Sequence, residues 1–220
     1  MDDHVKKGKP MLKNLVFDFG NVLVVFKPEI HLRSYVQTDE EAMALRNLIW
    51  ESKPWKDADS GMGNRQDTFE RLSKLYPEKT ELFRSVLFQC SSWLTIPEEV
   101  EDVLRRLQAA GYALYYISNT NPMDYETMMN RYPILHELKG GLVSFKEKML
   151  KPDPAIYQLL LERYGLQAEE CLFVDDMAIN TKAAEIVGYH TLTLTTGAAA
   201  LETALRTIPE IDQKLSGIEV

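Results

Sequence analysis

Carboxylates follow two apolar runs of this chain, at positions where a buried strand is expected to end. The apolar run at residues 15–17 ends on Asp18, and the run at 171–174 ends on the adjacent pair Asp175 and Asp176. A run that is apolar throughout is typical of a central strand of a parallel sheet, which is covered on both faces. Ligands of open α/β sheets bind at the carboxyl ends of the strands. We therefore expect these carboxylates to meet at one edge of a sheet.

Two further groups are expected at the same edge. The apolar run at residues 113–117 is followed by Ser118 and Asn119, and Lys151 lies in a loop before a helix that Asp153 and Pro154 begin. Such residues also have ordinary uses. Ser118 could be a turn residue, and Lys151 an exposed surface lysine.

The carboxylates could also have purely structural roles, and such a role explains Asp18 better than it explains the adjacent pair. Asp18 could merely cap a turn, because the following Gly20 and Asn21 tolerate left-handed backbone angles. Asp175 and Asp176 are harder to explain in this way, since adjacent buried carboxylates repel and a metal ion is the usual remedy. Asn180 could begin a helix or support a metal ligand.

The elements that would position these residues alternate along the chain. Strands are expected at residues 15–17, 113–117, 141–145, 171–174 and 191–195, and helices lie between the later ones. This alternation indicates an α/β fold with a doubly wound, parallel, Rossmann-like sheet. Thr38 with Glu41 and Thr95 with Glu98 have the spacing of helix capping boxes. A last helix is expected at 198–206.

Residues 28–94 differ from the rest of the chain because they contain helical patterns and no convincing strand. We expect a small all-helical cap there, inserted after the first strand, with a core formed by 11–27 and 95–220. Trp50, Trp55 and Trp93 are expected to pack this cap rather than to form a substrate cage. The cations Lys53, Lys56 and Arg65 could contact a substrate or form a solvated face.

Composition excludes several classes of function. The net charge is −8 and no cluster of Lys and Arg could follow a nucleic-acid backbone, so nucleic acid is not an expected partner. No uncharged stretch is long enough to cross a bilayer, and residues 1–10 are expected to be a disordered tail and not a signal peptide. Two distant cysteines do not indicate a disulfide framework, which suits a cytoplasmic location. The sequence gives no indication of oligomeric state.

The ordered set of motifs resembles the haloacid dehalogenase (HAD) superfamily of hydrolases, subfamily I, whose members are mostly phosphotransferases. The motifs are DFGN at residues 18–21, ISN at 117–119, KPDPAIY at 151–157 and FVDD at 173–176. Each motif alone is weak, but together they follow the order of the superfamily over about residues 11–195. The expected helical insertion resembles the first type of cap in that superfamily.

The resemblance implies a Mg²⁺-dependent phosphatase acting on a small phosphorylated metabolite. Asp18 would be the nucleophile and form an aspartyl-phosphate, since a carboxylate is ionised at neutral pH without a helping base. Mg²⁺ would be held by Asp18, Asp176 and the Gly20 carbonyl, with Asp175 bound directly or through water. Ser118 and the Asn119 amide would hold phosphate oxygens, and Lys151 would neutralise charge on the transferring group.

The chain departs from the family pattern at Gly20. Many phosphatases of the family carry a second Asp at this position as general acid and base, and proton delivery to the leaving group is typically worth about 10²–10⁴ in rate. Water or another side chain must supply the proton, or the leaving group must hardly need one. The runs DFGNVL and ISNTN are most similar to the α-D-glucose-1-phosphatase-like sugar phosphatases, which favours a sugar phosphate as substrate.

Three other functions are compatible with the same motifs. A 2-haloacid dehalogenase would use Asp18 to attack carbon without a metal, which leaves the acidic pair and the expected phosphate cradle unused. A non-catalytic HAD-like protein could bind a phosphorylated ligand if Gly20 marks a degraded site. A phosphomutase would need a group that controls the proton on its acceptor hydroxyl. The lack of a second Asp at Gly20 makes this function less favoured.

Overall fold

The core of the protein is a parallel sheet, as the alternation of strands and helices along the chain predicts. The computed structural model describes residues 11–218, so the expected tail at residues 1–10 lies outside the described part. The five strands lie in the order β3-β2-β1-β4-β5, and each neighbouring pair is parallel. Their bounds are β1 Asn14–Phe17, β2 Ala113–Ser118, β3 Gly140–Val143, β4 Cys171–Asp175 and β5 His190–Thr193. The order reverses at β1, which places a ligand-binding crevice at the carboxyl end of that strand.

Helices cover both faces of the sheet and bury alternate residues of each strand. Leu15 and Phe17 of β1 contact one apolar cluster, whereas Val16 contacts the other, as the two-residue period of a strand requires. The first face is covered by α6 Glu98–Ala109, α7 Pro122–Arg131, α8 Ile134–Glu137, η4 Ala198–Ala200, α12 Leu201–Leu205 and α13 Pro209–Ser216. The second face is covered by α10 Pro154–Tyr164, η3 Ala168–Glu170 and α11 Ala178–Val187.

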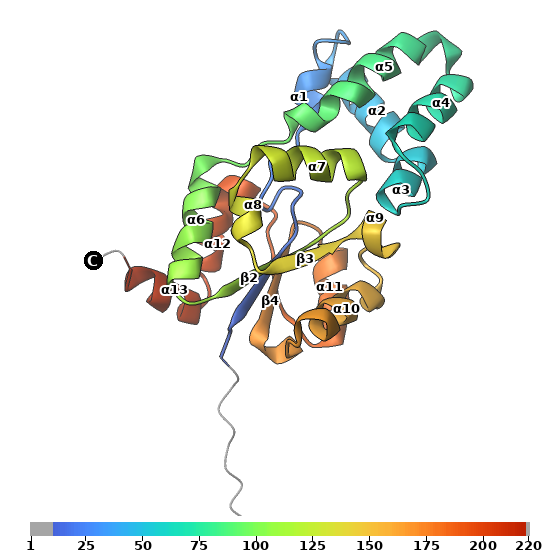
Figure 1. The fold of residues 1–220 in the computed structure, drawn as a ribbon. Helices are drawn as coiled ribbons and strands as arrows, with labels where there is room; N and C mark the ends of the chain where they lie inside the picture. Colours follow the sequence, from blue (N-terminus) through green and yellow to red (C-terminus); the bar gives the residue numbers. More distant parts are fainter. Residues whose placement is uncertain (1–10, 219–220) are drawn as a thin grey trace, which may run out of the picture.

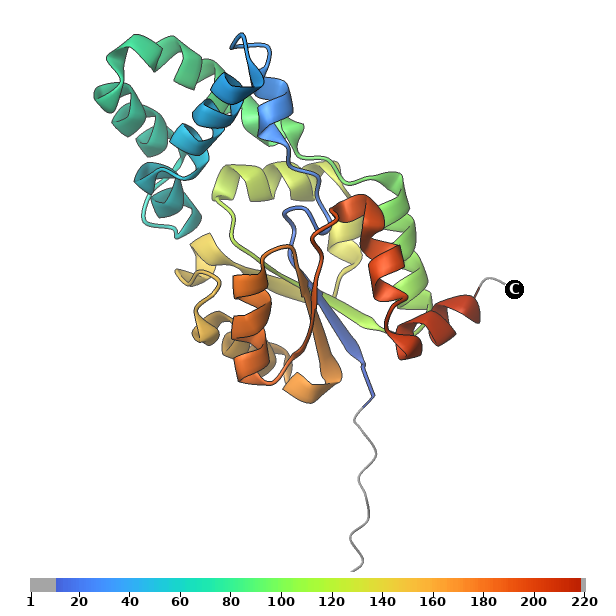
Figure 2. The same ribbon diagram turned by 180° about the vertical axis from the view of Figure 1, so that it is seen from behind.

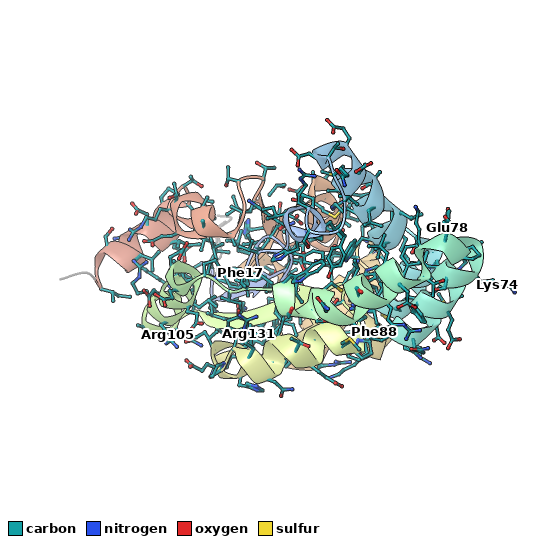
Figure 3. All side chains as sticks on the ribbon, turned by 90° about the horizontal axis from the view of Figure 1, so that it is seen from above. Phe17, Lys74, Glu78, Phe88, Arg105 and Arg131 are labelled. Atoms are coloured by element: carbon teal, nitrogen blue, oxygen red, sulfur yellow. The ribbon has the colours of Figure 1, made fainter. Side chains whose placement is uncertain are left out.

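A separate group of helices lies beyond the carboxyl ends of the strands. It has its own apolar cluster, centred on side chains such as Ile49, Phe83 and Leu87 that are fully buried. Figure 3 labels Lys74 and Glu78 at the outer end of this group, at the opposite end of the view from Arg105. Its members, here called the cap helices, are α1 Pro28–Leu32, α2 Asp39–Trp50, α3 Lys53–Asp59, α4 Arg65–Leu75, η1 Pro77–Lys79, α5 Thr80–Gln89 and η2 Cys90–Trp93.

The chain enters and leaves the cap helices at one place. Val25 and Thr95 form an isolated antiparallel bridge, in which the Val25 N–H donates to the Thr95 carbonyl at 2.7 Å and the Thr95 N–H donates back at 3.3 Å. This bridge explains one wrong prediction. Thr95 does not begin a capping box, because its extended backbone pairs with Val25, and Pro97 becomes the N-cap of α6 without a side-chain hydrogen bond.

Other local predictions hold or shift by a few residues. The capping box at Thr38 is present, since Thr38 Oγ1 accepts from the Glu41 N–H and Glu41 Oε2 accepts from the Thr38 N–H. The third strand ends at Val143, because Ser144–Glu147 turns into the short helix α9, and the fifth covers His190–Thr193. The expected last helix divides into η4 and α12, and α13 was not expected. No helix within residues 11–218 has the length and apolar character that a bilayer span needs.

Candidate active site

Three carboxylates meet at the carboxyl edge of the sheet. β1 and β4 are hydrogen-bonded neighbours in which Phe17 lies opposite Val174, so the next residues, Asp18 and Asp175, emerge side by side. Asp176 follows directly in the chain. One carboxylate oxygen of each residue lies within 4.8 Å of the other two. The sheet register therefore brings these distant acids to one point.

Lys151 is the cation of this cluster and is itself buried. Its Nζ lies 2.8 Å from Asp18 Oδ1 and 2.6 Å from Asp175 Oδ2, and its side chain is only 1% exposed. Burial lowers the pKa of Lys151, but the two carboxylates outweigh this effect and leave its pKa above the ordinary value. The lysine therefore stays charged and ties the loop before α10 to β1 and β4.

One ammonium group does not balance three carboxylates. Burial raises the pKa of Asp18 to about 7; Lys151 opposes this rise and Asp175 adds to it. Burial also raises the pKa of Asp176, and the hydrogen bond from Asn21 opposes it. A divalent cation among these oxygens would favour the ionised form of each acid.

Neighbouring amides fix the orientation of the acids. Asp175 Oδ1 accepts from Asn180 Nδ2 and from the Met177 N–H, both at 2.9 Å. Asp176 Oδ2 accepts from Asn21 Nδ2 at 3.0 Å. Asn180 is thus a partner of the carboxylate and also lies in the first turn of α11, which covers Ala178–Val187. The role of Asn21 was not expected beyond its left-handed backbone, which the structure has at φ 55°.

Asn119 supports Lys151 through a pair of hydrogen bonds. Its Nδ2 donates to the Lys151 carbonyl at 3.0 Å, and its Oδ1 accepts from the Lys151 N–H at 2.9 Å. The side-chain amide is therefore occupied by the lysine backbone. Ser118, which is 2% exposed, ends β2 beside it.

A cavity of about 290 Å³ opens between this edge and the cap helices. Gly20, Ser118 and Asn119 line it from the sheet side. The other four residues expected from the sequence, Asp18, Lys151, Asp175 and Asp176, do not line the cavity but lie together at the same edge of the sheet. Most of the other lining side chains are apolar. They are Phe19, Val24, Phe26, Trp50, Trp55, Leu94, Met128 and Met177, together with Thr120 and the acids Glu51, Asp59 and Asp124.

The cap cations do not lie in this cavity as free charges. Arg65 is 4% exposed, and its guanidinium donates to Asp124 Oδ1 at 2.8 Å and lies over the Trp55 ring. Lys53 and Lys56 pair with acids of the cap helices. Arg65 is therefore not part of a solvated face, because it is buried and its ion pair with Asp124 of α7 joins the cap helices to the core.

Two of the three tryptophans pack the cap helices and also line the cavity, a combination that the sequence did not predict. Trp50 and Trp55 are 8% and 5% exposed and pack on each other, with ring centroids 5.3 Å apart, as expected for cap packing. Both nevertheless line the cavity. Trp93 stacks on His31 instead.

Asp59 is a cavity residue that the sequence reasoning missed. It is the last residue of α3, and its Oδ1 accepts from Asn121 Nδ2 at 3.2 Å. Its backbone carbonyl accepts from Ser144 Oγ at 2.5 Å, and Ser144 Oγ accepts from the Thr120 N–H. No motif marked this residue.

Comparisons with known proteins point to one family. A family model described as haloacid dehalogenase-like hydrolase matches residues 12–188. The sesquiterpene phosphatase astK of Aspergillus oryzae is 27% identical over 187 residues, which cover 85% of this chain and 92% of that protein. An (S)-2-haloacid dehalogenase of Pseudomonas putida is 32% identical over 130 residues, which cover 59% of this chain and 50% of that protein.

A solved structure shares the fold. The HAD family enzyme bt-2542 of Bacteroides thetaiotaomicron, in complex with magnesium and inorganic phosphate, matches with a TM-score of 0.66 and 22% identity. The match covers 83% of this chain and 93% of that one.

Proposed function

Because this chain belongs to the haloacid dehalogenase-like hydrolases, we propose that it is a Mg²⁺-dependent phosphatase that forms an aspartyl-phosphate on Asp18. Its substrate is a small phosphorylated metabolite. The observation that carries the proposal is the group of three carboxylates within 4.8 Å of one another around a single buried lysine. A phosphatase needs this excess of negative charge to bind a metal ion, whereas a reaction without a metal does not.

The donor set fits Mg²⁺, which prefers hard oxygen ligands and keeps several waters. Asp18 and Asp176 would bind it through carboxylates, and Gly20 through its carbonyl. Asp175 differs, because Lys151, Asn180 and the Met177 N–H already occupy both of its oxygens. We therefore assign Asp175 to a water-mediated contact. Bound Mg²⁺ would supply charge neutralisation at the phosphoryl group.

The protein side chains divide the remaining work. Asp18 Oδ1 accepts from Lys151 and from the Phe19 N–H at 2.7 Å, which holds the carboxylate in place for attack. Lys151 neutralises charge that develops on the transferring group. Ser118 Oγ and the main-chain N–H of Asn119 would hold phosphate oxygens, while the Asn119 side chain positions Lys151.

The cavity limits the organic part of the substrate. A volume of about 290 Å³ suits a small molecule, and the aromatic lining from Phe19, Phe26, Trp50 and Trp55 favours an apolar face on it. The motif resemblance favours a sugar phosphate. A substrate panel should therefore contain sugar phosphates and phosphate esters of apolar alcohols of similar size.

The test is turnover by the purified protein on this panel, with Mg²⁺ and with EDTA. We expect inorganic phosphate release that requires Mg²⁺ and disappears in Asp18→Asn. Turnover that persists in EDTA would overturn the proposal, and chloride release from 2-chloropropionate under those conditions would establish the dehalogenase instead. Equal background turnover in Asp18→Asn would indicate a binding protein.

We also propose a cytoplasmic location. Cys90 and Cys171 are both buried and unpaired. Free thiols of this kind suit a reducing compartment. Fractionation of the native host cells would test this proposal.

A further inference from the structure

The proposed phosphatase lacks an acid where Gly20 stands, and the cavity offers three candidates to replace it. Glu51, Asp59 and Asp124 are its carboxylic acids outside the metal cluster. Glu51 pairs with Lys56 and its side chain is 58% exposed, so it lies at the rim in contact with solvent.

Asp124 of α7 joins the cap helices to the core through its side-chain contacts. Its Oδ1 accepts from Arg65 and from Ser91 Oγ at 2.5 Å, and its Oδ2 accepts from Asn121 Nδ2 at 2.7 Å. Both carboxylate oxygens of Asp124 are therefore occupied by these donors.

Asp59 differs from both. Burial raises the pKa of Asp59 to about 7, the hydrogen bond from Asn121 opposes this rise, and Asp124 adds to it. Arg65 and Trp55 also oppose the rise. A general acid is most effective when its pKa is close to the working pH.

The backbone of Asp59 is fixed against the phosphate-binding end of the sheet. Ser144 Oγ donates to the Asp59 carbonyl and accepts from the Thr120 N–H. Thr120 directly follows Asn119 in the chain. The turn that follows α3 also packs tightly, because a Cβ added at Gly61 would lie 2.3 Å from the Phe145 carbonyl oxygen. These contacts fix the backbone at Asp59, which lines the same cavity as Gly20 and Ser118.

We propose that Asp59, carried by the cap, is the proton donor for the leaving group and replaces the acid that Gly20 lacks. The inference rests on the proposed phosphatase function. In the first step an Asp18 oxygen bonds to phosphorus, the bond from phosphorus to the ester oxygen breaks, and that oxygen keeps the electron pair and takes the Asp59 proton. In the second step water attacks phosphorus and gives a proton back to Asp59, which releases phosphate and restores the Asp18 carboxylate.

The test separates proton donation from a structural role by the choice of leaving group. 2-Phenylethyl phosphate leaves as an alkoxide that needs a proton, whereas p-nitrophenyl phosphate leaves as a stabilised phenolate that does not. We expect Asp59→Asn to reduce kcat on the first ester by about 10²–10⁴ and on the second by a far smaller factor. Asn keeps an oxygen that can accept from Asn121, and unfolding by urea checks that the fold is intact.

Two further variants sharpen the result. Asp57→Asn is the matched control, because Asp57 lies on the same helix but pairs with Lys53 and Arg71 outside the cavity. Gly20→Asp in the Asp59→Asn background should restore turnover of the alkyl ester, since an added Cβ at Gly20 meets only Asp18 Oδ2, at 3.8 Å. The restored acid would stand at the position of the family's usual one.

The outcomes distinguish the two proposals. Equal losses on both esters in Asp59→Asn, or no loss on either, would overturn the role of Asp59. Wild-type turnover confined to the nitrophenyl ester would do the same. Full activity in Asp18→Asn, or no turnover of either ester in the presence of Mg²⁺, would instead overturn the phosphatase itself and the Asp59 role with it.

Discussion

Lys151→Met tests whether the buried lysine is the counterion of the acid cluster. Two ion pairs would be lost, at 2.8 Å and 2.6 Å, while the side-chain volume changes little. Unit charges about 3 Å apart attract by roughly 5–6 kcal/mol at an effective dielectric near 20, and burial offsets part of this. Removing one partner of a buried ion pair typically destabilises a protein by about 3–5 kcal/mol. We expect a loss of that size in EDTA.

The dependence on conditions identifies the cause. Mg²⁺ should reduce the difference in unfolding free energy between Lys151→Met and wild type, because the bound ion neutralises the carboxylates in place of the lysine. Lowering the pH from about 7 to about 5 should reduce this difference too, since Asp18, whose pKa burial raises to about 7, takes up a proton and then needs no cation. A simple packing defect would respond to neither change.

The assay is urea unfolding with Mg²⁺ and with EDTA, combined with steady-state turnover. kcat should fall by about 10²–10³, which is the usual loss when a group that stabilises transition-state charge is removed. The exposed Lys182 on α11 provides the control Lys182→Met, which should change neither quantity. The reasoning would be refuted if Lys151→Met in EDTA unfolded within about 0.5 kcal/mol of this control.

Three further predictions follow from contacts around the site. Asn21→Ala removes the hydrogen bond to Asp176 and should raise the Mg²⁺ concentration for half-maximal activity by about 10–100-fold, as measured by metal titration; an unchanged midpoint would show that Asn21 does not orient the ligand. Arg65→Met leaves Asp124 buried without its cation and should destabilise the fold by about 3–5 kcal/mol in urea; a loss near zero would mean that the pair does not hold the cap. The pKa of Asp59 is raised from 3.8 to about 7, so its contribution to stability is present below pH 4 and is lost as the pH rises to 7. The unfolding free energy of wild type relative to Asp59→Asn should therefore fall by about 1 kcal/mol per pH unit across that window, and a flat difference would contradict the raised pKa.

The sequence contains enough to predict the sheet and its acidic edge. Apolar runs that stop abruptly at Asp18 or Asp175 reflect strands buried on both faces, and the alternation with helices leaves only a parallel sheet. Ser118, Asn119 and Lys151 were predicted in the same way, from their positions after strands or before a helix. Their proposed contacts with substrate stay predictions.

The cap was predictable in class but not in detail. Helical periodicity in residues 28–94 indicates helices, yet it does not show which face meets the core. For that reason Arg65 could not be recognised as a buried ion-pair partner of Asp124, which is 59 positions away in the chain. Asp59 was missed for the same reason, because its significance comes from Ser144 and Asn121, neither of which is near it in sequence.

The short bridge between Val25 and Thr95 has a consequence for how such a protein can change. Both ends of the cap meet at this bridge, and no strand of the sheet takes a residue from the segment between them. A different helical cassette could be joined at the same two points without altering the strand order or the register of the acids. The proposed proton donor, Asp59, lies on this segment, so such an exchange would replace it while the acidic edge of the sheet stays as it is.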